Sequence, residues 1–239
     1  MVNKAIKPRC ELVNNEVANE LFLYGPVFSG KDWWYDEDEY ICPQNVASAL
    51  KEADGKDIVV RINTNGGDVF AGISIYNTLK DYKGKITVKV DGIAASAGSV
   101  IAMAADELKM GVGAMLMIHN AWTFTYGNAD ELRKAADDLD KISDSITEIY
   151  MTRFKGEKDE LKSLLDAESY LTSEESIALG LADGEEPEEG ESDDNEKNKQ
   201  DVKNSIVAKY MAKRNESRQE ASKGSFFMDE LSNQMQHLW

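Results

Sequence analysis

The stretch Val88–Ala105, VKVDGIAASAGSVIAMAA, decides the fold of this chain. Val88 and Val90 flank a lysine, an alternation typical of the end of a buried strand, which Asp91-Gly92 is expected to break. Val100 to Ala105 then form an apolar run that, as a helix, can only be buried. Because the residues between are small, Ser96 is predicted to lie in a tight strand-to-helix turn without a bulky neighbour.

A hydroxyl at the N-terminus of a helix lies beside free backbone N–H groups that favour developing negative charge. This placement suits a nucleophile next to an oxyanion hole. Serine is equally common as a plain helix N-cap, so both interpretations of Ser96 stay open on this stretch alone.

Composition excludes several classes of protein. The 239 residues carry a formal net charge of -17, which argues against nucleic-acid binding. Cys10 and Cys42 lack metal-ligand spacing, and we predict neither a metal nor another cofactor. No apolar run resembles a signal peptide or a membrane span, so we expect a soluble, cytoplasmic protein without a membrane partner.

Strands and helices are predicted to alternate along the chain, which indicates a parallel sheet in an α/β fold. Strands are expected at 20–27, 57–62, 86–90, 107–110 and 115–118. Helices are expected at 43–53, 71–83, 130–154, 157–165 and 172–180. The helix over 130–154 has an apolar seam at heptad-like spacing, which suits packing against another helix: Leu132, Ala135, Leu139, Ile142, Ile146 and Ile149.

The character of the chain changes after Asp183. Residues 185–196 include eight acidic residues and no basic one, which predicts a solvated linker. We expect a lead-in over 1–19, a main domain over 20–183, an acidic linker over 184–200 and a tail over 201–239. In that tail, Val202, Ile206, Tyr210 and Lys213 would share one helical face, and Phe227, Leu231, Met235 and Trp239 could form a docking helix. An unstructured tail is the alternative.

A serine nucleophile needs a general base. His119 follows the apolar strand MLMI, whereas the other histidine, His237, lies in the tail. Asp166 and Glu168 are both candidates for the carboxylate that orients the imidazole, and spacing does not choose between them. Gly66-Gly67 could supply an oxyanion-hole amide, although NGG is also ordinary turn chemistry, and the residue after the nucleophile, Ala97, could supply the second.

Four segments in order resemble the motifs of the ClpP-type serine peptidases: INTNGGDVFAGISIYNTL (62–79), DGIAASAGSVIAMAA (91–105), MLMIHNAW (115–122) and SYLTSEESIALGLAD (169–183). The resemblance is closest to the phage head maturation (prohead) proteases. It rests there on NGGD in place of Ser-Pro-Gly-Gly, on IHNAW, and on GNADELRKAADDLDKISDSI over 127–146. The N-terminal region, with its Trp33-Trp34 loop, departs from the loops that meet an unfoldase in housekeeping ClpP.

The resemblance implies a ClpP/crotonase-like spiral of strand–helix units with a largely disordered C-terminal tail. It implies Ser96 as nucleophile, His119 as base, and Gly67 and Ala97 at the oxyanion hole. It implies Glu168 as the orienting acid, because Glu168 lies two residues before Tyr170-Leu171-Thr172. Most members of the family have Asp at the position of Glu168. It also implies a homo-oligomeric ring in which Leu132 to Ile149 cross an interface, and scaffold and capsid proteins as substrates.

Three alternatives stay open. The chain could be a housekeeping-type subunit fed by an ATP-driven unfoldase, a capsid assembly protein carried on a peptidase fold, or a coenzyme A-binding crotonase relative. Because the resemblance ends at Asp183, residues 184–239 are expected to be dispensable for hydrolysis and to serve delivery to the procapsid.

Overall fold

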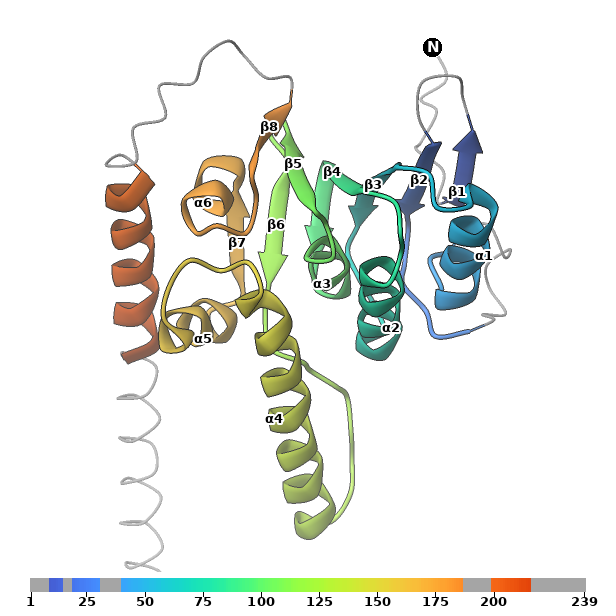
Figure 1. Ribbon diagram of the computed structural model, residues 1–239. Coiled ribbons are helices and arrows are strands. Elements are labelled where there is room, and N and C mark those ends of the chain that lie inside the picture. The colour runs from blue at the N-terminus through green and yellow to red at the C-terminus, as the bar shows by residue number, and fades with distance from the viewer. Residues whose placement is uncertain (1–8, 15–18, 31–39, 187–198, 216–239) are drawn as a thin grey trace, which may run out of the picture.

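The computed structural model describes residues 9–14, 19–30, 40–186 and 199–215 (Figure 1). The Trp33-Trp34 loop, the acidic run beyond Glu186 and the apolar residues from Phe226 to Trp239 lie outside the described residues. Among the described residues, no helix is long and apolar enough to cross a membrane.

One mixed sheet forms the centre of the fold. Its strands are β1 (Arg9–Asn14), β2 (Asn19–Tyr24), β3 (Ile58–Thr64), β4 (Ile86–Ala95), β5 (Glu107–Gly111), β6 (Met115–Ile118), β7 (Ser169–Thr172) and β8 (Gly184–Glu186). The main path runs β1-β2-β3-β4-β5-β8, and it is parallel from β2 onward, with β1 antiparallel at one edge. β6 pairs in parallel with β4 and antiparallel with β7. The predicted α/β fold with a largely parallel sheet is therefore confirmed.

The helices are α1 (Pro43–Ala53), α2 (Val69–Lys80), α3 (Ala97–Ala102), α4 (Ala129–Met151), α5 (Lys158–Asp166) and α6 (Ser173–Ala178), followed by a helix over 199–215. α1, α2 and α3 lie together against the sheet, whereas α4 projects away from it beside an extended segment (Figure 1). Alternate residues of β3 and β4 are fully buried, as expected for strands whose one face is covered by helices.

β4 does not end at Asp91-Gly92, so the strand break expected there is wrong. The Asp91 carboxylate accepts a hydrogen bond from the Tyr24 hydroxyl at 2.6 Å and pairs with the Arg61 guanidinium. Arg61 lies on the neighbouring strand β3, and Tyr24 lies one strand further away, on β2. This pairing lets an acidic residue remain in the strand. At this point β4 exchanges β5 for β6 as its partner, so its second half carries the chain directly to Ser96.

The segment after Asp183 begins with ordered structure, which corrects the predicted boundary of the acidic linker. Glu185 and Glu186 pair with β5 in β8, and Lys89 forms an ion pair with Glu186 at 2.7 Å. The helix over 199–215, drawn in orange-red in Figure 1, buries Ile206, Val207 and Tyr210 in the same core as the sheet. The predicted amphipathic face is confirmed at Ile206 and Tyr210, whereas Lys213 is exposed.

The apolar seam of α4 divides into two parts. Ile146 and Ile149 are buried within the chain, so the expectation that the whole seam lies in an oligomer interface is wrong at these two residues. Leu132 is 43% exposed, and Ala135 is partly exposed. The part of the seam that this chain leaves accessible runs from Leu132 to Ile142.

Candidate active site

Ser96 lies at the junction of β4 and α3 with a strained backbone. Its φ of 55° and ψ of −123° belong to a region that non-glycine residues rarely occupy, and such strain gathers at functional sites. The Ser96 N–H donates to the Met117 carbonyl at 2.9 Å, which ties the turn to β6. The Ser96 side chain makes no capping hydrogen bond to α3, so the plain N-cap interpretation does not account for it.

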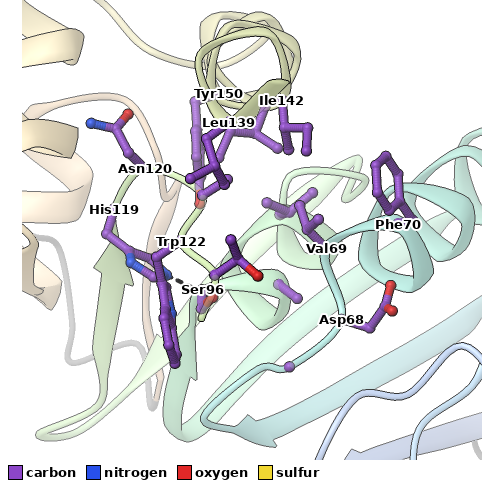
Figure 2. Close-up of a pocket in the computed structure, with 16 residues that line it drawn as sticks. Asp68, Val69, Phe70, Ser96, His119, Asn120, Trp122, Leu139, Ile142 and Tyr150 are labelled. Carbon is purple, nitrogen blue, oxygen red and sulfur yellow. Dashed lines mark hydrogen bonds between the residues drawn. The ribbon is translucent and has the colours of Figure 1, made fainter. Parts of the chain in front are cut away.

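The Ser96 hydroxyl instead faces a histidine. Ser96 Oγ lies 2.7 Å from His119 Nε2, at the end of β6 (Figure 2). Burial lowers the pKa of the His119 imidazole below its ordinary value, and the negative charge of Glu168 partly opposes that shift. A neutral imidazole at neutral pH can accept a proton from the serine hydroxyl.

Glu168 and Asp166, the two candidate acids, have different surroundings. Glu168 lies in a hollow that it shares with Ser96 and His119, and its φ of 50° is another strained, non-glycine conformation. Its carboxylate acts on His119 through charge, because no hydrogen bond joins the two side chains among the described residues. Asp166 binds elsewhere: one oxygen accepts from Asn120 Nδ2 at 2.8 Å, and the other pairs with Arg214 Nε at 2.7 Å.

The two predicted oxyanion-hole residues lie beside the serine. Gly67 and Ala97 line one cavity with Ser96, and neither backbone N–H has an acceptor within the described part of the chain. Only glycine fits at position 67, since φ is 151° and an added Cβ would lie 2.1 Å from the Val27 carbonyl oxygen. Two free amides next to a nucleophile can stabilise an oxyanion.

Ser96 and His119 lie where two hollows meet. The first, a cavity of about 310 Å³, is mainly apolar beyond the serine and receives side chains from α2 and α4, including Val69, Phe70, Leu139 and Ile142 (Figure 2). The second, of about 580 Å³, contains Asn65, Met117, Glu168 and Tyr170. Trp122 is 75% exposed and lines both hollows. This groove can accommodate an extended chain with an apolar side chain in the first hollow.

Comparison with known proteins agrees with this geometry. The family model described as Clp protease matches residues 14–184, which include β2 to β7 and every residue of the candidate site. The chain belongs to the Clp protease family. It is also 30% identical over 130 residues to the ATP-dependent Clp protease proteolytic subunit of Deinococcus radiodurans, an alignment that covers 54% of this chain. The alignment spans 64% of that relative, somewhat less than two thirds of its length.

In this Clp protease a buried hydroxyl network supports the serine turn, and sequence reasoning missed it. Ser99 Oγ lies 2.7 Å from the Ser96 carbonyl oxygen, 2.8 Å from the Met117 carbonyl oxygen and 2.8 Å from the Tyr150 hydroxyl. Tyr150 is fully buried, and burial raises the pKa of its hydroxyl. The network therefore stays neutral and holds the serine turn to β6 and α4. The three-residue spacing from Ser96 to Ser99 was the available signal, but it is too common to indicate a site.

Proposed function

We propose that this Clp protease is a serine endopeptidase that works through an acyl-enzyme. The single observation that carries the proposal is the 2.7 Å contact between Ser96 Oγ and His119 Nε2 beside the amides of Gly67 and Ala97. An unpaired amide pair beside a Ser–His contact is the arrangement that acyl transfer requires. A coenzyme A-binding crotonase relative would leave that contact without a role.

The proposed reaction has two stages. Ser96 Oγ attacks the peptide carbonyl carbon while His119 takes the hydroxyl proton, and the amides of Gly67 and Ala97 bind the resulting oxyanion. The carbon–nitrogen bond breaks as His119 gives the proton to the leaving amine, which leaves an ester on Ser96. Water, activated by His119, then hydrolyses that ester. Glu168 stabilises the imidazolium that forms in each stage by its charge.

The substrates that we propose are the scaffold and capsid proteins of a phage, cleaved during head maturation in the host cytoplasm and procapsid. Two observations support this proposal. The segments NGGD, IHNAW and 127–146 resemble the phage head maturation proteases, and NGGD and IHNAW both lie around Ser96. Asp68 of NGGD caps α2 by accepting from the Ala71 N–H at 2.8 Å, and Trp122 of IHNAW lines both hollows. We further propose that the chain acts as a ring-forming homo-oligomer.

An ATP-dependent role is the second candidate, and the name of the Deinococcus radiodurans relative, an ATP-dependent Clp protease proteolytic subunit, favours it. A subunit of that kind would degrade chains delivered by an unfoldase and would bind that partner stably. A third candidate, an assembly protein on a peptidase fold, depends on tail residues outside the described ranges.

Co-expression with the neighbouring capsid genes separates these candidates. Wild type should shorten the scaffold or capsid protein at defined positions, detected by mass spectrometry of intact products, and Ser96→Ala should leave them whole. Stable co-purification with an ATPase and no defined capsid cleavage would favour the ATP-dependent role. Normal head maturation with Ser96→Ala would favour the assembly role.

A further inference from the structure

The helix over 199–215 is anchored to α5 by one arginine. Arg214 Nη1 donates to the Asp159 carbonyl at 3.4 Å and to Ser163 Oγ at 3.2 Å, and Arg214 Nε pairs with Asp166 Oδ2 at 2.7 Å. The side chain is 16% exposed, so the contacts are largely shielded from water. A single guanidinium therefore contacts the beginning, middle and last residue of α5.

Asp166 connects this anchor to the active site. Its second oxygen, Oδ1, accepts from Asn120 Nδ2 at 2.8 Å, and Asn120 directly follows His119. Asp166 is also the last residue of α5, two positions before Glu168. One carboxylate thus fixes the segment that carries the base relative to the segment that carries the acid.

We propose that Arg214 is a positioning residue for the Ser96–His119 site, acting through Asp166 and Asn120. This inference rests on the proposed function. Arg214 Nε forms an ion pair with one Asp166 oxygen, although it makes no hydrogen bond among the described residues, and the other Asp166 oxygen accepts from Asn120. The pair therefore places a positive charge beside the carboxylate that contacts the residue after His119. Neither Arg214 nor Asp166 lines either hollow, whereas Asn120 lines the first hollow next to His119. Arg214 and Asp166 therefore do not contact substrate there, and we expect them to act on the orientation of the His119–Asn120 segment.

A second cation on the same helix provides a matched control. Lys203 pairs with Glu160 Oε2 of α5 at 3.7 Å, and its side chain is 15% exposed, close to the value for Arg214. Glu160 Oε2 accepts from the Glu157 N–H at 3.0 Å at the other end of α5. Within the described ranges, Glu160 forms no hydrogen bond or ion pair with the segments that carry Ser96, His119 and Glu168. Loss of Lys203 therefore tests helix anchoring without changing the connection to His119.

The experiment compares Arg214→Met, Arg214→Lys, Asp166→Leu and Lys203→Met in the full chain. Hydrolysis of acetyl-leucine 4-nitrophenyl ester gives kcat and KM, a fluorophosphonate probe gives the labelling rate of Ser96, and thermal melting measures stability. We expect Arg214→Met to lower kcat and the labelling rate by about tenfold, as small displacements of reacting groups do, with KM unchanged. Arg214→Lys should have a kcat between those of Arg214→Met and wild type, because lysine retains the positive charge but lacks the planar guanidinium group.

Lys203→Met should lose no more stability than Arg214→Met, because in the described part of the chain Lys203 makes one polar contact at 3.7 Å where Arg214 makes three, and it should keep the wild-type kcat. The double variant Arg214→Met/Asp166→Leu should be no slower than Asp166→Leu alone, since both changes break the same connection. Equal kcat values for Arg214→Met and Lys203→Met would overturn the inference. If Arg214→Met does not fold, wild-type kcat in Asp166→Leu would overturn it as well. If the wild type is inactive and Ser96 is not labelled, the proposed function is refuted and the inference with it. If the wild type is active, Ser96→Ala is inactive and Arg214→Met is unimpaired, the inference alone is refuted.

Discussion

Ser96 Oγ and His119 Nε2 lie 2.7 Å apart because each directly follows one of two neighbouring parallel strands, β4 and β6. Ala95 pairs with Met117, so the residues that follow each strand emerge at the same edge of the sheet. The contact therefore depends on strand pairing, and substitutions of the two side chains should remove chemistry without removing the fold.

Ser96→Ala and His119→Ala are each expected to reduce hydrolysis of acetyl-leucine 4-nitrophenyl ester below about one thousandth of the wild-type rate. Both proteins should still fold and melt cooperatively, because the apolar core contains neither side chain. The double variant should be no slower than either single variant, since nucleophile and base act as one unit. Substantial hydrolysis by either single variant would contradict the assignment.

Glu168→Gln should move the acid limb of the kcat/KM profile to lower pH. His119 must be neutral to act as base, its pKa lies below the ordinary 6.5, and the Glu168 charge is what opposes that lowering. Removing the charge lowers the pKa of His119 further, while the plateau falls because the imidazolium loses its counter-charge. A pH series of initial rates measures both changes.

The control for that experiment is Asp166→Asn. The charge of Asp166 is not among those that shift the pKa of His119, so the acid limb should keep its wild-type position. If the acid limb moved with Asp166→Asn and stayed fixed with Glu168→Gln, Asp166 rather than Glu168 would be the acid that acts on His119.

Leu132→Lys is expected to dissociate the proposed oligomer and to abolish activity. Leu132 is an exposed apolar residue on the accessible part of the α4 seam, and a charge there could not be buried against a second subunit. Asp137→Lys introduces the same side chain on the opposite face of α4 and should leave assembly intact. Sedimentation velocity with a parallel hydrolysis assay measures both, and a fully active wild-type monomer would refute the prediction.

Ile206→Ala should lower the free energy of unfolding by about 2–5 kcal/mol, as loss of a buried aliphatic side chain does. Ile206 is 5% exposed within the common core, although it lies beyond the segment that the motifs cover. Met211→Ala, at a 37% exposed residue of the same helix, should cost far less. Urea denaturation of both variants tests the prediction, and equal losses would show that the helix does not contribute to the core.

The local features of this protein could be predicted from the order of its residues. Small residues before an apolar run place Ser96 at a strand-to-helix turn, Pro43 begins α1, and periodicity locates the strands that carry Ser96 and His119. These features follow from backbone conformation and burial over a few neighbouring residues, which a sequence displays directly.

Contacts between groups far apart in the sequence became visible only in the folded chain. Asp91 looked like a strand end, but Arg61 on β3 compensates its charge and the Tyr24 hydroxyl on β2 donates to it, so it remains within β4. Asp166 and Glu168 looked equivalent, but Arg214 and Asn120 occupy Asp166 and leave Glu168 beside the histidine. The environment of a carboxylate is set by elements far away along the chain, and residue spacing carries no information about those partners.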